Sequence, residues 1–141
     1  MPHPKSKRRR ALTEQERTKI MQDSPEDTQH YWCVYLLTGL RRSELAKLPA
    51  SAAELDVPAP FLRIRGKGDH ERIVPLEGLA LDTIQRLRQD ALERGDGLLC
   101  PLSGGTLGER WRRDRNALDL DPALTLHSFR HDFATWLVNY T

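Results

Sequence analysis

The chain has 141 residues, a formal net charge of +2 at pH 7, and a composition that is 38% hydrophobic and 30% charged. This length suits one domain, and this composition is typical of a globular protein rather than a disordered one. No apolar run approaches the ~20 residues that span a bilayer, and the N-terminus lacks the apolar stretch of a secretory signal. Cys33 and Cys100 do not make a disulfide framework, so we expect buried, reduced thiols in a cytoplasmic protein.

Positive charge is concentrated in two segments of the chain. Residues 1–10 hold five Lys or Arg and no acid, and residues 109–116 hold four arginines. Both segments suit contacts with phosphates, although a linker and a solvated helix face would show the same pattern. We predict a basic linker or tail over residues 1–12 and one domain over residues 13–141.

The N-terminal part of the domain predicts two helices. Thr13 and Glu16 have the spacing of a capping box, which marks a helix start. The segment 24–27, Ser-Pro-Glu-Asp, predicts a second start, because proline fits the first helical position and acids favour the positive end of a helix. This second helix is almost wholly apolar from Tyr31 to Leu37, which indicates a buried core helix that ends at Gly39.

The middle of the chain changes its hydrophobic period. Residues 41–48 predict a short helix that Pro49 stops. Over residues 61–76, apolar and charged side chains alternate on both sides of a turn-rich segment, Gly-Lys-Gly-Asp at 66–69. This pattern predicts a β-hairpin with an exposed tip.

The C-terminal half returns to helical spacing over residues 79–94 and 106–118 and again from Leu126 onward. The expected architecture is mainly α with a small antiparallel β-sheet. The side chains predicted to face inward are Ala80, Ile84, Leu87, Ala91, Leu107, Trp111, Leu118, Phe129, Phe133, Trp136, Leu137 and Tyr140.

Three motifs stand in these elements: TGLRRSEL at 38–45, IRGKGDHERIVPL at 64–76 and LHSFRHDFATWL at 126–137. In this order they resemble the catalytic domain of the tyrosine recombinases, the phage-integrase family. The start of the domain, RRALTEQE at 9–16, also resembles that family, so the resemblance covers nearly the whole chain. It implies the DNA breaking-rejoining fold with its C-terminal part missing.

The resemblance also implies the roles of individual side chains. Transesterification at a phosphodiester builds extra negative charge on the phosphorus oxygens, which guanidinium groups bind through planar, permanently charged forks. An imidazole near neutral pKa can donate to the same oxygens or move a proton, and a lysine on the hairpin protonates the departing 5′-oxygen. The implied catalytic residues are Arg41, Lys67, His127 and Arg130, with Glu44 and His131 in support.

The family attacks with a tyrosine that lies well beyond its second arginine and forms a 3′-phosphotyrosyl link. This chain ends eleven residues after Arg130. Tyr140 falls on the apolar stripe of the last helix, and Tyr31 and Tyr35 fall in the core helix. We therefore expect no nucleophile in this chain, an inactive fragment, and uncovered apolar surface that favours self-association.

Duplex DNA is the implied partner, bound by tetramers in the family, and phosphate contacts make such binding salt-dependent. The resemblance implies a bacterial or phage-encoded protein and no metal, nucleotide, other cofactor or membrane. The predicted contacts to the DNA backbone are Arg42, Arg65, Arg112 and Arg113.

Three other interpretations remain open at this stage. A type IB topoisomerase-like enzyme uses a similar residue set, and a non-catalytic DNA-binding or regulatory module is compatible with the absent tyrosine. His127 and His131 stand at i and i+4, a spacing that can chelate zinc on a helix, although no Glu of a hydrolytic zinc motif lies between them.

Overall fold

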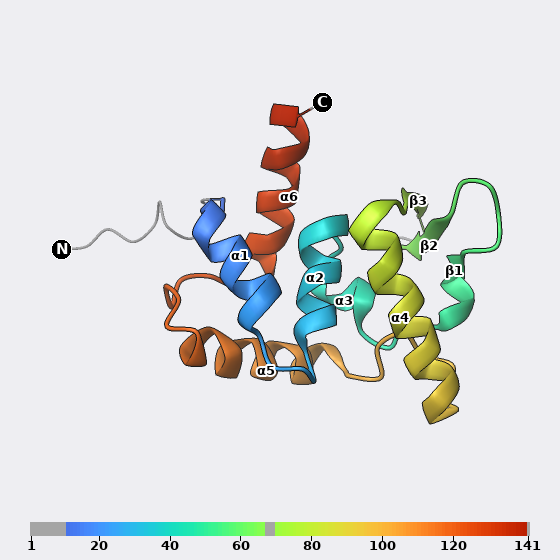
Figure 1. The fold of residues 1–141 in the computed structure, drawn as a ribbon, viewed down its shortest axis with the longest axis horizontal. Coiled ribbons are helices and arrows are strands. Elements are labelled where there is room, and N and C mark those ends of the chain that lie inside the picture. The colour runs from blue at the N-terminus through green and yellow to red at the C-terminus, as the bar shows by residue number, and fades with distance from the viewer. Residues whose placement is uncertain (1–10, 67–69, 141) are drawn as a thin grey trace.

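The computed structural model of the protein describes residues 11–66 and 70–140, with side chains up to Ala134. Helices surround a central helix, α2, and a small sheet lies at one end of the domain (Figure 1). The elements in chain order are α1 (Glu14–Asp23), α2 (Gln29–Thr38), α3 (Arg42–Leu45), a 3-10 turn (Ala50–Ala52), β1 (Ala53–Glu54), β2 (Phe61–Arg65), β3 (Glu71–Pro75), α4 (Gly78–Arg94), α5 (Gly104–Ala117) and α6 (Leu126–Tyr140).

The predicted start of α1 is confirmed. Thr13 Oγ1 accepts a 3.1 Å hydrogen bond from the Glu16 backbone, and Glu16 Oε1 accepts one of 2.8 Å from the Thr13 backbone. The prediction for α2 was wrong by about one turn, since the helix begins at Gln29. The carboxylate of Asp27, expected to stabilise the helix start, instead binds arginines of α5.

Helix α2 is the centre of the core, as its apolar sequence predicts. Trp32 and Tyr35 are fully buried, and α1, α4 and α6 all pack against this helix. Trp32 meets Trp111 of α5 edge to face at 5.5 Å between ring centroids, and Trp111 meets Phe129 of α6 at 4.8 Å. Such aromatic contacts fix how α5 and α6 sit on α2.

Gly39 ends α2 as predicted, in a left-handed conformation with φ of 72°. Helix α3 follows after two residues and is shorter than expected, because Lys47 also adopts a positive φ of 57°. Beyond Lys47 the backbone turns away from the helix axis, and the Leu99 N–H donates to the Leu48 carbonyl oxygen. The short helix therefore presents Arg41 and Arg42 at its start.

The predicted hairpin is confirmed as two strands of an antiparallel sheet in the order β1-β2-β3. In β2, Leu62 and Ile64 are buried, and Arg63 and Arg65, which alternate with them, are exposed. Strand β1 was not predicted, because two residues are too few to show an alternating pattern. The tip, residues 67–69, lies outside the described residues, and the predicted catalytic residue Lys67 lies there.

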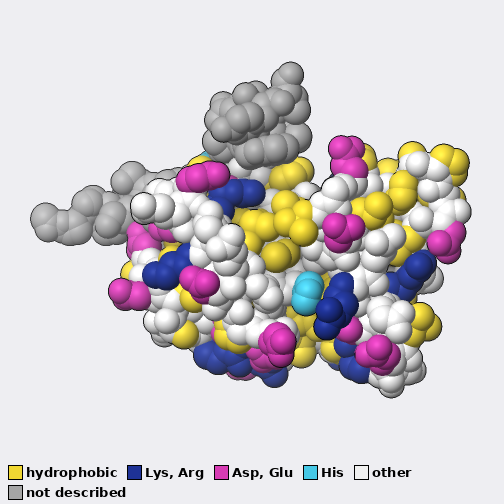
Figure 2. All heavy atoms as spheres, viewed as in Figure 1, with side chains coloured by type: hydrophobic (Ala, Val, Ile, Leu, Met, Phe, Trp, Pro, Cys, Tyr) yellow, Lys and Arg dark blue, Asp and Glu magenta, His cyan; other side chains and the backbone are white. Residues whose placement is uncertain are grey.

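Helices α4 and α5 confirm the predicted inward stripes, since Ile84, Leu87, Leu107 and Trp111 are at most 2% exposed. In α6, Phe129 is fully buried, whereas the side chains of residues 135–140 are outside the description. Figure 2 shows hydrophobic side chains gathered between α1 and α4 on one face of the molecule. Acidic and basic side chains are interspersed around that area.

Both cysteines are buried, as expected. The folded domain includes Leu12, which is 7% exposed and lies inside the predicted tail; its N–H donates 3.0 Å to Asp132 of α6. Over the part of the chain that the structure describes, no helix has both the length and the apolar character to cross a bilayer.

Candidate functional site

Two arginines from distant parts of the chain meet where α2 ends. Arg41 directly precedes α3, and Arg130 lies in the second turn of α6. The Arg130 guanidinium donates a 2.5 Å hydrogen bond from Nη1 to the carbonyl oxygen of Gly39. This bond joins α6 to the turn that carries Arg41, so the two cations are held together.

Gly39 is required at this junction for two reasons. Its positive φ disfavours other residues, and a Cβ atom there would overlap the ring of Phe133 on α6. On the far side of α6, Asp132 accepts from the Leu12 backbone and forms an ion pair with Arg17 of α1. The position of Arg130 is therefore fixed from both sides of its helix.

Arg41 and Arg130 border two adjoining hollows. The first, which we call the hairpin-side hollow, has a volume of about 980 Å³ and opens toward β2 and β3. Its lining residues are Arg41, Ser43, Glu44, Arg65, Gly66, His70, Arg72 and Arg130.

The second hollow, which we call the α5-side hollow, has a volume of about 370 Å³. Five arginines and a histidine contribute to its wall, and no carboxylate does so among the residues described. Its lining residues are Arg41, Arg42, Gly108, Trp111, Arg112, Arg115, Thr125, Leu126, His127 and Arg130.

The Arg130 guanidinium, at the boundary between the two hollows, lies near other positive charges. Burial lowers the pKa of the Arg130 guanidinium, and the positive charges of Arg41 and Arg72 lower it further, against the opposing effect of Glu44. Arginine nevertheless stays protonated at any working pH. A cluster of cations with this shape favours an anion, and planar guanidiniums suit the oxygens of a phosphate.

Glu44 is the carboxylate that organises the hairpin side. Its side chain is 4% exposed, and it accepts 2.6 Å and 3.0 Å hydrogen bonds from Arg72 of β3. It also accepts a 2.8 Å bond from the backbone N–H of Arg41. Burial alone would raise the pKa of Glu44, but these hydrogen bonds and the charges of Arg72 and Arg41 together hold it below its ordinary value. Glu44 thus ties the hairpin to the start of α3 as a carboxylate.

Arg72 is a site residue that sequence reasoning missed. It pairs with Ile64 in the sheet register and lies two residues before the buried Val74, so it is on the inward face of the hairpin. A cation at an inward position of an alternating strand was the available signal, since burying it requires a partner. That partner, Glu44, is 28 residues away in the sequence.

The structure brings together three of the four predicted catalytic residues. Arg41, His127 and Arg130 line the α5-side hollow. Lys67 is outside the described residues, but its neighbour Gly66 lines the hairpin-side hollow and donates a 2.6 Å hydrogen bond to the His70 carbonyl. The predicted supporting residue Glu44 lies in the hairpin-side hollow, whereas His131 lines neither hollow.

The phage integrase family model matches residues 10–141 of this chain. The chain belongs to the phage integrase family. The tyrosine recombinase XerC of Halalkalibacterium halodurans is 36% identical over an alignment of 118 residues, and the match covers 72% of this chain and 38% of that protein. The tyrosine recombinase XerD of Pseudomonas putida is 30% identical over an alignment of 113 residues, and the match covers 72% of this chain and 37% of that protein. This phage integrase domain thus spans well under half of these relatives.

Solved structures show the same fold. The lambda integrase catalytic core superposes with a TM-score of 0.72 at 23% identity, over 92% of this chain and 83% of that one. The XerA recombinase superposes with a TM-score of 0.75 at 22% identity, over 91% of this chain and 49% of that one. The predicted fold class, mainly α with a small antiparallel sheet, is confirmed.

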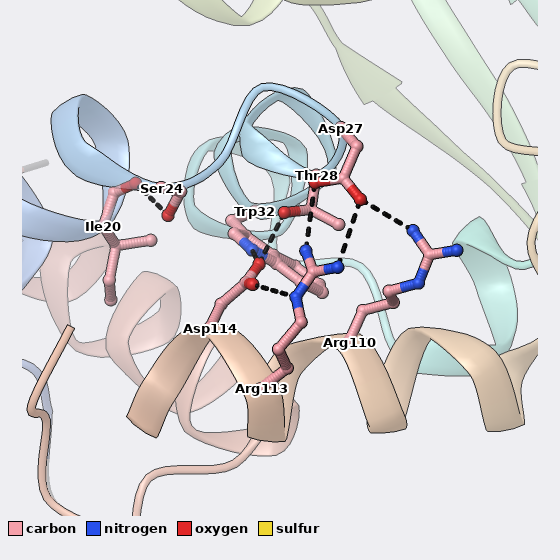
Figure 3. Close-up of polar contacts among 8 residues, drawn as sticks. All are labelled: Ile20, Ser24, Asp27, Thr28, Trp32, Arg110, Arg113 and Asp114. Carbon is pink, nitrogen blue, oxygen red and sulfur yellow. Dashed lines mark hydrogen bonds and ion pairs between the residues drawn. The ribbon is translucent and has the colours of Figure 1, made fainter. Parts of the chain in front are cut away.

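The predicted DNA-contacting arginines of this phage integrase domain lie in different surroundings. Arg42 and Arg112 line the α5-side hollow, and Arg65 lines the hairpin-side hollow. Arg113 instead donates to Asp114 at 2.8 Å and to Asp27 at 3.0 Å, as Figure 3 shows. A contact between Arg113 and DNA stays a prediction, and its guanidinium has a structural role in the fold.

Asp114 is the centre of the contact drawn in Figure 3. Its carboxylate is fully buried and accepts hydrogen bonds from Trp32 Nε1 at 2.8 Å and from Thr28 Oγ1 at 2.5 Å. These bonds, together with the one from Arg113, fasten α5 to the beginning of α2. Buried carboxylates need such partners, so this contact fixes the register of the two helices.

The tyrosines of the core helix are not placed as nucleophiles in this phage integrase domain. Burial raises the pKa of Tyr31 to about 12 and raises that of Tyr35 further. The Tyr35 hydroxyl donates to the carbonyl oxygen of Arg42. The side chain of Tyr140 is outside the description. The described residues contain no group of three or more His, Cys, Asp and Glu side chains that could hold a metal ion.

Proposed function

We propose that this chain is the phosphate-binding part of a tyrosine recombinase catalytic domain. In the complete protein, this domain cuts and rejoins duplex DNA in site-specific recombination through a 3′-phosphotyrosyl intermediate. The observation that carries the proposal is that Arg41 and Arg130, 89 positions apart in the sequence, line the same two hollows.

The chemistry follows from where the cations lie. A scissile phosphate that sits between Arg41 and Arg130 meets a guanidinium on each side. As the phosphorane forms, charge grows on its non-bridging oxygens, and these preorganised donors stabilise it more than they stabilise the ground state. The Gly39 carbonyl holds Arg130 in place beforehand, so little reorganisation is needed during the reaction.

We assign proton transfer to the two groups that flank this pair. His127 lines the α5-side hollow and donates to a phosphate oxygen or moves the proton of the nucleophile. Lys67, in the hairpin, protonates the leaving 5′-oxygen. Glu44 and Arg72 fasten this hairpin to the start of α3. In this assignment, Glu44 and Arg72 are positioning residues.

The nucleophile is assigned outside the residues described. Tyr31 and Tyr35 are buried and have raised pKa values, so neither offers a phenolate to DNA. The sequence predicts that the remaining tyrosine, Tyr140, lies on the apolar stripe of the last helix. We therefore propose that the chain as given binds a phosphodiester without forming a covalent link to it.

The relatives support duplex DNA as the partner and assembly of the complete protein on it. The XerH recombinase, which shares the fold with a TM-score of 0.70 at 23% identity over 92% of this chain and 42% of that one, was solved bound to its difH substrate. Lambda integrase was solved as a tetramer bound to a Holliday junction. We propose the same class of partner for this protein.

A binding assay with a paired variant tests the proposal. Fluorescence anisotropy with a short labelled duplex at low salt should give measurable binding for the wild-type chain and a loss of at least tenfold for Arg41→Gln combined with Arg130→Gln. The matched control, Arg86→Gln with Arg94→Gln, removes two α4 arginines that are paired with Asp90 and Asp96 and should change affinity little. Equal losses in both double variants would overturn the proposal.

A nicked suicide duplex tests the nucleophile assignment separately. Denaturing gel electrophoresis should show no protein–DNA adduct with the chain as given. An adduct would show that a nucleophile lies within the 141 residues and would overturn the proposed inactivity of the chain, while supporting the recombinase chemistry.

A further inference from the structure

Two arginines in the α5-side hollow have no task in the reaction just described. Arg42 and Arg112 are exposed, and neither side chain has an ion-pair or hydrogen-bond partner among the described residues. We propose that they form a second phosphate site, which binds a backbone phosphate of the same DNA strand next to the scissile one. This inference rests on the proposed function and adds a substrate contact to it.

The two guanidiniums are held close to each other by the surface of α5. A Cβ atom at Gly108 would lie 3.0 Å from Arg42 Nη1 and 4.0 Å from Arg112 Nη1. Arg112 is one helical turn after Gly108, so both share a face of α5. A Cβ atom at Gly104 would lie 3.9 Å from Arg42 Nε. The absence of side chains at both glycines thus lets Arg42 lie along the helix beside Arg112.

Two cations this close repel each other unless an anion lies between them. On the opposite side of the same helix, Arg110 and Arg113 share the carboxylate of Asp27, and Arg113 also pairs with Asp114, so the two positive charges are balanced by two carboxylates. No carboxylate lines the α5-side hollow among its described residues. The uncompensated positive charge of Arg42 and Arg112 therefore indicates a bound anion that is not part of the chain, and guanidinium geometry favours a phosphate.

The residues around Arg42 and Arg112 form the walls of the α5-side hollow and connect it to Arg41 and Arg130. Arg115 closes one wall of the hollow, where its Nη1 donates to the carbonyl oxygens of Pro122 and Leu124 at 2.9 Å and 3.4 Å. Arg41 and Arg130 belong to the lining of this hollow as well as of the hairpin-side hollow. Because all four arginines line one hollow, a strand with its scissile phosphate between Arg41 and Arg130 can place a neighbouring phosphate at Arg42 and Arg112.

The salt dependence of duplex binding tests this site. For B-DNA, each lost phosphate contact makes the slope of log affinity against log salt shallower by about 0.9. We expect this change for Arg42→Gln or Arg112→Gln, with a several-fold loss of affinity at low salt. Arg110→Gln removes the same charge two residues away, from a side chain already paired with Asp27, and should leave the slope unchanged. Equal slopes for Arg112→Gln and Arg110→Gln would overturn the inference.

A titration with inorganic phosphate separates this inference from the proposed function. In proton–nitrogen NMR spectra, the Nε–H signals of Arg42 and Arg112 should shift with phosphate in the wild-type chain and also in Arg130→Gln. If these signals do not shift, or shift only while Arg130 is present, there is no second site, whether or not the chain binds DNA. If they shift in a chain that fails to bind duplex DNA, the phosphate site stands and the proposed function fails.

Discussion

Helix α5 carries arginines on both sides of its buried stripe, and the two sides differ in what faces them. On one side, Asp27 and Asp114 bind Arg110 and Arg113, and the charges cancel within the fold. On the other side, Arg112 lies beside Arg42 in the wall of a hollow that no described carboxylate lines. The first side fastens α5 to α2, and the second leaves positive charge exposed for a ligand.

The difference teaches that pairing, rather than the number of arginines, separates structural from binding surfaces in this domain. A run of four arginines between residues 109 and 116 looks uniform in the sequence. In the fold, the residues three apart, Arg110 and Arg113, meet the same carboxylate, whereas Arg112 points to the opposite edge. Variants on the two sides should therefore affect stability and DNA affinity separately.

The largest effect should follow from breaking the structural side at its centre. Asp114→Ala leaves the buried Trp32 and Thr28 donors without their acceptor, which should lower the free energy of unfolding by about 3 kcal/mol or more. Urea unfolding followed by tryptophan fluorescence measures this. The folded fraction of the variant should keep the wild-type salt slope for DNA. A loss below about 0.5 kcal/mol, the range of ordinary surface substitutions, would contradict the role assigned to Asp114.

The next effect concerns the junction that holds Arg130 to Arg41. Gly39→Ala places a side chain at a positive φ and against the Phe133 ring, so we expect a loss of roughly 2 to 4 kcal/mol in unfolding free energy. Gly95→Ala is the matched control, because Gly95 has a φ of 81° but no atom within 4 Å of its Cβ position. Thermal unfolding should show a clearly smaller loss for the control, and equal losses would remove the packing argument.

The hairpin side should show its own dependence on pH. The folded pKa of Glu44 lies below its ordinary value of 4.5, so its ionised form stabilises the fold above about that pH. This stabilisation is lost as the pH falls through the lowered pKa. Glu44→Gln should cost about 1 to 3 kcal/mol at neutral pH, and the difference from wild type should shrink on acidification.

Unfolding free energies measured from neutral pH down to about pH 3 check this expectation. Glu109→Gln is the control, since Glu109 is exposed and has no ion pair in the described structure. A difference between wild type and Glu44→Gln that stays constant with pH would show that the carboxylate charge is not what Glu44 contributes.

The smallest expected effect sharpens the comparison within one helix. Arg113→Gln should leave the salt slope of DNA binding unchanged. It should lower the free energy of unfolding by about 1 kcal/mol, because the bonds to Asp27 and Asp114 are lost. A slope as shallow as that of Arg112→Gln would place Arg113 on the DNA and remove the distinction between the two sides of α5.

Local signals predicted most of the elements. The capping box at Thr13 and the left-handed Gly39 act within a few residues, and a single amphipathic stripe marks α4 and α5, so these features are readable from the sequence. The start of α2 was wrong because Asp27 and Thr28 bind residues of α5, more than 80 positions away. Local preference gave way there to tertiary contacts.

The candidate site was also predictable only in part, because local patterns do not show tertiary contacts. The resemblance carried by the motifs around Arg41 and Arg130 anticipated that these residues meet. Arg72 was missed because its partner Glu44 lies in a different motif, and no local pattern links the two. Arg113 was grouped with Arg112 because charge runs do not reveal which side of a helix has carboxylates opposite it.

A double-mutant cycle on Arg41 and Arg130 tests the central claim, that these two residues hold one shared phosphate. Duplex affinity is measured at fixed low salt for wild type, Arg41→Gln, Arg130→Gln and the double variant. We predict strong coupling, so that the double variant loses little more affinity than the more damaging single variant. Losses that add fully would show that the two arginines bind separate phosphates and would contradict the account.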